Sequence, residues 1–178
     1  MKKIVVFIDS GDTLIDEGTE IKTEDLTVIH AKMIDGAREA LTTLHDLGYK
    51  IALVADGTKR SFDNIYDEQK LQYCFDAKAI SGEIGHEKPH ESMFRTAMDA
   101  LGLTDDDKHR IVMIGNNIKR DIVGAKRMGI RSVLITYSPR YNMIPENAEE
   151  TPDFTISSPK ELVELIERLN NEISDQKR

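Results

Sequence analysis

The stretch Ile4-Val5-Val6-Phe7-Ile8-Asp9-Ser10-Gly11-Asp12-Thr13-Leu14 decides the fold. Five consecutive apolar residues with no polar alternation are typical of a strand that is buried on both faces, in the middle of a parallel sheet. The run ends at Asp9, and open α/β sheets bind their ligands at the carboxyl ends of such strands. Because an unpaired buried carboxylate is costly, we expect Asp9 to face a solvated crevice. The alternative is an aspartate that only closes the strand and begins a turn.

Further apolar runs separate stretches with helical spacing along the rest of the chain. The runs predict strands at 50–55, 77–80, 111–114, 132–136 and 153–156, with helices between them. This alternation predicts an α/β fold of three layers, a doubly wound, Rossmann-like parallel sheet with helices on both faces. The polar segment 15–32 predicts either a short hairpin or one helical turn. With 178 residues, we expect a single domain over 1–178.

The last helix has the clearest start signal. The sequence Ser158-Pro159-Lys160-Glu161 is a capping box with proline at the first helical position. The chain becomes polar from about Asn170, where we expect the helix to fray.

Charge and composition narrow the partners. The formal net charge of −8 disfavours nucleic acid and anionic membrane surfaces as partners, because both would repel the chain. The single cysteine, Cys74, leaves no disulfide framework and no thiolate metal cluster. No apolar run approaches the length of a membrane span, and the first run is too short for a signal peptide. We therefore expect a cytoplasmic protein.

Polar residues follow the predicted strands. Asp9 ends the first, Asp56-Gly57-Thr58 follow the second, Lys88 lies in the loop after the third, and Asn116-Asn117 follow the fourth. Parallel strands bring these positions to one edge of the sheet. Carboxylates, an ammonium group and amide oxygens suit a hard cation together with a phosphate. No glycine-rich P-loop or dinucleotide motif follows any strand.

As an ordered set, these residues resemble the haloacid dehalogenase superfamily over nearly the whole chain. The matching positions are Asp9…Thr13, Ala55-Asp56-Gly57, Lys88-Pro89 and Gly115-Asn116…Asp121. The resemblance implies that Asp9 is a nucleophile that becomes an aspartyl phosphate, that Thr13 supports its loop, and that Lys88 neutralises Asp9 and the phosphoryl group.

The resemblance also implies two binding sites. A Mg²⁺ site would be formed by Asp9, the backbone carbonyl of Gly11, Asn116 and Asp121. A phosphate site would lie after the second strand, where Ala55, the Asp56 backbone N–H, the Thr58 hydroxyl and Lys88 are the candidates.

Three positions depart from the family pattern. Gly11 stands where the family's phosphatases have an aspartate as general acid and base, and the adjacent Asp12 points the opposite way in an extended segment. Ala55 lacks the usual hydroxyl, and Asn116 lacks a carboxylate charge. General acid–base catalysis contributes about 10²–10⁴-fold, so we expect low activity and weak Mg²⁺ binding.

The segments 14–33 and 57–88 are too short for the lid domain that many family members insert, so we expect no sizeable cap domain. An open site excludes little by shape. We expect a small phosphorylated substrate, or a bulky one that covers the site itself, and a second subunit in a homo-oligomer is another way to close it. Arg140, in the loop 137–152, either binds a substrate anion or is solvated.

Three functions compete. The leading one is a Mg²⁺-dependent hydrolase of a phosphate monoester with Asp9 as nucleophile. The second is a binding or regulatory protein on an inactivated enzyme fold. The third, weaker one is attack of Asp9 on carbon, as in the dehalogenases, whose small substrates need enclosure.

Overall fold

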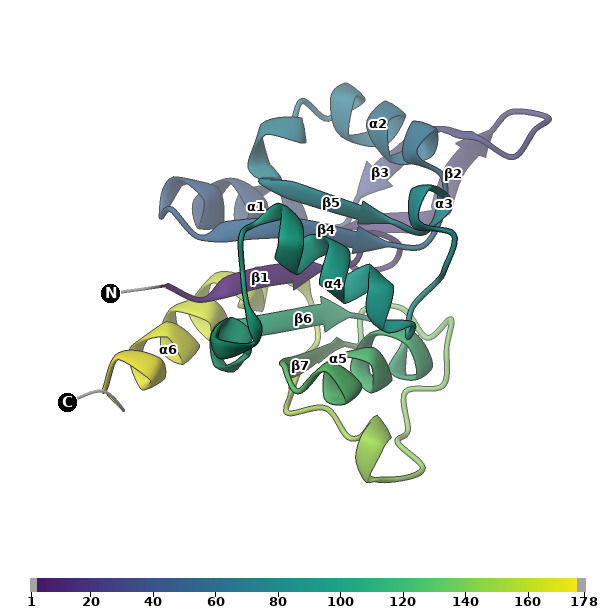
Figure 1. Cartoon of the computed structure of the whole chain (residues 1–178). Helices are drawn as coiled ribbons and strands as arrows, with labels where there is room; N and C mark the ends of the chain where they lie inside the picture. Colours follow the sequence, from purple (N-terminus) through teal and green to yellow (C-terminus); the bar gives the residue numbers. More distant parts are fainter. Residues whose placement is uncertain (1–2, 176–178) are drawn as a thin grey trace.

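The computed structural model of the protein describes residues 3–175 and contains a six-stranded sheet between two layers of helices (Figure 1). All five strand pairings are parallel, in the order β5-β4-β1-β6-β7-β8. The strands are β1 (Val5–Ile8), β4 (Lys50–Ala55), β5 (Ala77–Ile80), β6 (Ile111–Gly115), β7 (Arg131–Ile135) and β8 (Phe154–Ile156). The predicted doubly wound α/β sheet is therefore confirmed.

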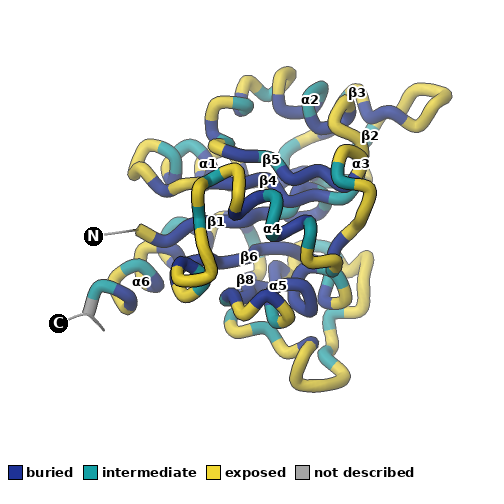
Figure 2. Tube along the Cα trace, in the orientation of Figure 1, coloured by how far each residue is buried: buried dark blue, intermediate teal, exposed yellow. Residues whose placement is uncertain are grey.

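Strand β1 is central and buried along its whole length (Figure 2). Because side chains alternate across a strand, Val6 and Ile8 pack in the core beneath α1, α2 and α6, while Val5 and Phe7 face α4 and α5. The helices are α1 (Ala37–Asp46), α2 (Lys59–Glu68), α3 (Ser81–Ile84), α4 (Glu91–Ala100), α5 (Val123–Met128) and α6 (Leu162–Asp175). Burial on both faces explains the uninterrupted apolar run.

The polar segment after β1 forms an antiparallel hairpin, the first of the two structures that its sequence allows. Strand β2 (Ile15–Lys22) pairs with β3 (Val28–Met33), and β3 lies beside α2 (Figure 1). The chain enters the hairpin through Asp12, whose φ of 47° is in the left-handed region. This turn directs β2 away from the axis of β1, so that the hairpin projects beyond the carboxyl edge of the sheet.

Two details differ from the sequence predictions. Helix α6 continues to Asp175 instead of fraying near Asn170, because the Asn170 side chain accepts a hydrogen bond from the Ile4 N–H (3.0 Å) and Ile173 packs into the core. After β6, a π-helical turn (Ile118–Ile122) precedes α5.

None of the helices in residues 3–175 combines the length and the apolar character that crossing a bilayer requires.

Candidate active site

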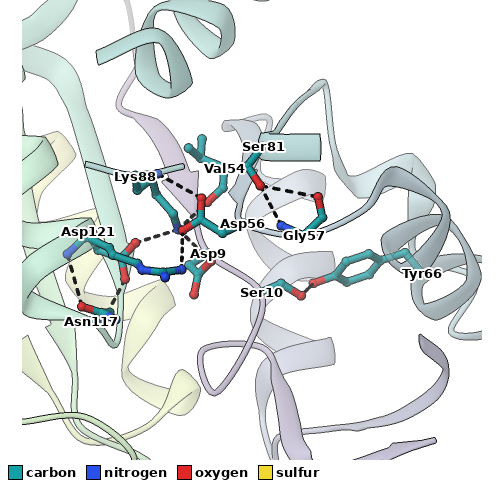
Figure 3. A network of polar contacts seen from close by, with 11 residues as sticks. Asp9, Ser10, Val54, Asp56, Gly57, Tyr66, Ser81, Lys88, Asn117 and Asp121 are labelled. Atoms are coloured by element: carbon teal, nitrogen blue, oxygen red, sulfur yellow. Dashed lines mark hydrogen bonds and ion pairs between the residues drawn. The ribbon is translucent and has the colours of Figure 1, made fainter. Parts of the chain in front are cut away.

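Three charged side chains meet at the carboxyl edge of the sheet (Figure 3). The ammonium group of Lys88 donates to Oδ1 of Asp9 over 2.8 Å and to Oδ1 of Asp121 over 2.7 Å. These residues come from the end of β1, the loop after α3 and the π-helical turn after β6. Charge-assisted hydrogen bonds of this length are strong, so Lys88 holds the two carboxylates at one place.

The backbone fixes the position of Lys88. Its N–H donates to Oδ1 of Asp56 (3.0 Å), and its ammonium group also donates to the carbonyl of Val54 (2.8 Å). The side chain is almost completely buried. Burial alone would lower the pKa of Lys88, but the neighbouring carboxylates of Asp121 and Asp9 raise it above the ordinary value. Lys88 is therefore charged and can neutralise an anion beside it.

Asp121 is fully buried and needs a glycine opposite it. A Cβ atom on Gly115 would lie 2.1 Å from Oδ2 of Asp121, so only glycine leaves room for this carboxylate. The same oxygen accepts the N–H of Asn117 (3.0 Å). Burial raises the pKa of Asp121 to about 7, against the opposing effect of Lys88. A cation beside Asp121 would favour its ionised form.

The oxygen donors at this edge fit a magnesium ion. Asp9 and Asp121 supply two carboxylates, and Asn116 is buried beside them with an amide nitrogen that has no hydrogen-bond partner among the described residues. Turning this amide over places its oxygen at the same point. Residues 3–175 contain no cluster of three or more His, Cys, Asp or Glu side chains that could hold a metal. Mg²⁺ characteristically binds one or two carboxylates and keeps several waters, so these donors suit it.

Only some of the residues predicted to bind phosphate line the pocket. The pocket at this edge has a volume of about 270 Å³ and is lined by Asp56 and Thr58 but not by Ala55, which is buried in β4. The Thr58 hydroxyl caps α2 by accepting the Ser61 N–H (3.3 Å). Thr13 also lies outside the pocket, fully buried, and its hydroxyl has no partner among the described residues. The phosphate and loop-supporting roles of these residues remain predictions.

The hairpin forms the other wall of the pocket. Glu17 and Glu20 of β2, Val28 of β3 and Leu26 of the turn between the strands line it, opposite Phe62 of α2. The carboxylates belong to β2, whereas Val28 belongs to β3, the strand that packs beside α2. The pocket therefore joins a charged end at the sheet to a partly apolar end under the hairpin.

The model of the haloacid dehalogenase-like hydrolase family matches residues 8–135, which is most of the chain. The chain belongs to this family. It is similar to the glyceraldehyde 3-phosphate phosphatase of Methanopyrus kandleri, with 31% identity over 129 residues that cover 72% of this chain and 54% of that protein. It is also similar to pyrophosphatase PpaX of Halalkalibacterium halodurans, with 26% identity over 140 residues that cover 77% and 62% of the two chains. The chain therefore spans little more than half the length of the curated relatives it matches.

Solved structures show the same fold. A haloacid dehalogenase-type phosphatase from Thermococcus onnurineus superposes with a TM-score of 0.74 at 17% identity, covering 93% of this chain and 98% of that one. The resemblance inferred from the ordered motifs is thus confirmed at the level of family and fold.

Residues that the motifs did not indicate also lie at this edge of the sheet. Arg120, one residue before Asp121, donates to Oδ2 of Asp56 (3.1 Å) and lies 3.1 Å from Glu87. The guanidinium group of Arg120 therefore compensates the negative charge of Asp56. The spacing of the predicted strands did not indicate Arg120, because this residue lies on the irregular turn after β6. The Ser81 hydroxyl accepts the N–H of Gly57 (2.9 Å) and donates to the Gly57 carbonyl (3.5 Å), and these contacts fix the loop before α2.

Asp12 does not take the place of the missing aspartate at position 11. Its side chain is 1% exposed and accepts the N–H of Glu17 through Oδ1 (3.1 Å), while its Oδ2 accepts the guanidinium of Arg140. Arg140 in turn lies 3.3 Å from Oε2 of Glu17. The Arg140 side chain is thus engaged by two acidic residues of the chain itself, Asp12 and Glu17. Burial and the nearby charge of Asp12 raise the pKa of Glu17.

Proposed function

We propose that the protein is a Mg²⁺-dependent phosphatase that hydrolyses a phosphate monoester through an aspartyl phosphate on Asp9. The observation that carries this proposal is the position of the Lys88 ammonium group, 2.8 Å from Asp9 and 2.7 Å from Asp121. The phosphatases among the curated relatives support it. A partly exposed carboxylate held beside a fixed positive charge can receive an anionic substrate that a free carboxylate would repel.

In the first step, a carboxylate oxygen of Asp9 attacks phosphorus and the bond to the ester oxygen breaks. Lys88 binds Oδ1 of Asp9, so attack through the other oxygen keeps this contact. Bound Mg²⁺ would supply electrostatic stabilisation of the phosphoryl oxygens, and Asp9, Asp121 and Asn116 are the side chains that would hold it. Water then releases phosphate and restores the Asp9 carboxylate.

Helix α2 supports the phosphate end of the pocket. Its N-terminus begins beside Gly57 and Thr58, which line the pocket, and the first N–H groups of a helix attract anions. Because the Thr58 hydroxyl accepts the Ser61 N–H and also shares a hydrogen bond with the Ser61 hydroxyl (2.8 Å), we assign the phosphate contact on this side to backbone N–H groups. The volume of about 270 Å³ fits a small phosphate monoester.

Release of phosphate from 4-nitrophenyl phosphate, with and without Mg²⁺, tests the proposal. The wild-type protein should turn over only with Mg²⁺, and Asp9→Asn should be inactive. Equal rates for the two proteins would contradict the proposal. A thermal shift with inorganic phosphate but no turnover would support the binding-protein alternative instead, and metal-independent release of halide would support attack on carbon.

A further inference from the structure

The carboxyl group of Glu17, in β2, fills the space beside Gly11. A Cβ atom built on Gly11 would lie 1.8 Å from Oε1 and 2.7 Å from Cδ of Glu17. A side chain at position 11 and the present position of this carboxyl group therefore exclude each other. Gly11 is two residues after Asp9, and both Asp9 and Glu17 line the pocket. An acidic group from the hairpin thus reaches the surroundings of the nucleophile from a different part of the chain.

Hydrolysis through an aspartyl phosphate needs one group that gives a proton to the leaving oxygen and then takes one from water. Such a group must reach the ester oxygen and the attacking water, so it must belong to the pocket. The carboxyl groups that line the pocket in the described part of the chain are Asp9, Glu17, Glu20, Asp56 and Asp121.

Most of these groups are already engaged. Asp9 forms the bond to phosphorus, and Asp121 is bound by the ammonium group of Lys88. Both oxygens of Asp56 accept hydrogen bonds, one from a backbone N–H and one from a guanidinium. Glu20 pairs with Lys22 on the hairpin (2.8 Å). Glu17 is the remaining carboxyl group. It lies beside Gly11, close to the nucleophile Asp9, and it takes no part in the contacts of the phosphate and metal sites.

Asp12, in the turn before β2, and Arg140, in the loop after β7, hold Glu17 in this orientation. Its N–H donates to Asp12, and its Oε2 lies 3.3 Å from Nε of Arg140, so Oε1 is the oxygen that lies against Gly11. The side chain is 31% exposed, which gives it contact with water in the pocket. Asp12 and Arg140 therefore act as positioning residues for a carboxyl oxygen that lies beside Gly11, two residues after the nucleophile.

We propose that Glu17 is the proton-transfer residue of this hydrolase, an inference that rests on the phosphatase activity proposed above. As Asp9 forms its bond to phosphorus, the electron pair of the ester P–O bond passes to the leaving oxygen, which takes the proton of the Glu17 carboxyl group. In the second step, Glu17 takes a proton from the attacking water. The water oxygen then bonds to phosphorus, and the electron pair of the P–O bond to Asp9 returns to that carboxylate.

The test uses full-length Glu17→Gln with two substrates, 4-nitrophenyl phosphate and a primary alkyl phosphate, in the presence of Mg²⁺. The alkyl leaving group needs a proton and the nitrophenolate does not. We expect turnover of the alkyl ester to fall about 10²–10⁴-fold. With the aryl ester, we expect a burst of one nitrophenolate per site, followed by slow turnover, with the phosphoryl group trapped on Asp9 and seen by mass spectrometry.

Two further variants make the result specific. Glu20→Gln removes a carboxylate from the same strand and pocket wall, and should show neither the burst nor the substrate dependence. Gly11→Asp/Glu17→Ala places an acid at position 11 in the space that Glu17 vacates. This double variant should regain most of the turnover that Glu17→Ala loses, because the two side chains compete for one volume.

The proposal is overturned if Glu17→Gln keeps wild-type turnover on both esters. It is also overturned if the burst is lost as completely as in Asp9→Asn, since Glu17 would then be needed before any proton is transferred. If the wild-type protein itself shows no Mg²⁺-dependent turnover, the proposed phosphatase function has failed and this inference fails with it.

Discussion

The guanidinium group of Arg120 lies 3.1 Å from the carboxylate of Asp56, and this ion pair joins the turn after β6 to the end of β4 across the candidate phosphate site. The Asp56 side chain is 9% exposed, whereas Arg120 is 40% exposed. A nearly buried carboxylate in this position would repel a phosphoryl group if it were not compensated. Arg120 would therefore make the acidic Asp56 compatible with the anionic substrate proposed above.

Removal of Arg120 should weaken substrate binding more than chemistry. In Arg120→Ala, the uncompensated charge of Asp56 should raise the KM for a phosphate ester about tenfold, equivalent to about 1.4 kcal/mol, with a smaller change in kcat. The double variant Arg120→Ala/Asp56→Asn should restore the KM, because asparagine can still accept the Lys88 N–H. Steady-state kinetics measure both effects. Arg127→Ala is the control, since Arg127 pairs with Glu149 on an exposed surface. An unchanged KM in Arg120→Ala would refute this account.

Loss of the Lys88 ammonium group should destabilise the protein as well as abolish activity. Lys88 and Asp121 are 2% and 1% exposed in their side chains, and removal of one partner of a buried ion pair costs about 3–5 kcal/mol. We therefore expect Lys88→Met to lower the free energy of unfolding by this amount, measured by urea denaturation in EDTA. Lys88→Met/Asp121→Asn should regain much of the stability and none of the activity. Equal stability of Lys88→Met and wild type would show that the pair contributes nothing.

The sequence predicted those parts of the fold that depend on long apolar runs and on residues next to them. Strand β1, the parallel sheet and the capping box at Ser158 follow from local patterns, and the structure brings Asp9, Lys88, Asn116 and Asp121 together as parallel strands require. Their chemical roles remain predictions that the experiments above address.

What the sequence did not reveal depends on side chains that reach the site from irregular segments. Glu17 is a polar residue in a polar hairpin, and its proximity to Gly11 arises only because Asp12 turns the chain with a positive φ. Arg120 and Arg140 are charged residues on turns, where a solvated side chain gives the same sequence pattern. The spacing of residues along the chain does not show which of these side chains faces the site, because tertiary contacts determine their orientation.

Asp153 should contribute stability that depends on pH. Burial would raise its pKa, but hydrogen bonds from Lys126 and from the N–H and hydroxyl of Ser132 outweigh it and lower the pKa below the ordinary value of 3.8. A lowered folded-state pKa gives stability that is present above about pH 4 and is lost as the pH falls further. We expect Asp153→Asn to unfold about 1 kcal/mol more easily at pH 7, a value reduced for partial solvent screening.

Urea denaturation at pH 7 and pH 3.5 measures this difference. The difference in the free energy of unfolding between wild type and Asp153→Asn should narrow at the lower pH, because the Asp153 carboxyl group takes up a proton more readily in the unfolded chain, where its pKa is the ordinary 3.8. Asp106→Asn provides an exposed acidic control that should show no gap at either pH. If wild type and Asp153→Asn differ by the same free energy of unfolding at both pH values, the charge of Asp153 does not contribute to stability and only the shape of its side chain does.

Asn116→Asp should strengthen metal binding. Asn116 is buried beside the charged end of the pocket, and its amide nitrogen has no partner among residues 3–175, so a carboxylate at this position would lose no hydrogen bond and would add an oxygen ligand with a full charge. We expect the Mg²⁺ concentration for half-maximal activity, and the Kd from calorimetry, to fall about tenfold. Without metal the variant should be less stable than wild type, because the added carboxylate lies near Asp9 and Asp121. Asn117→Asp is the matched control. The Asn117 side chain caps the π-helical turn by accepting the Arg120 N–H (3.2 Å), and an aspartate can accept the same hydrogen bond. We expect this variant to bind Mg²⁺ with a Kd within about twofold of wild type, well below the tenfold change that 1.4 kcal/mol represents. If Asn116→Asp binds Mg²⁺ no better than Asn117→Asp, residue 116 does not belong to the metal site.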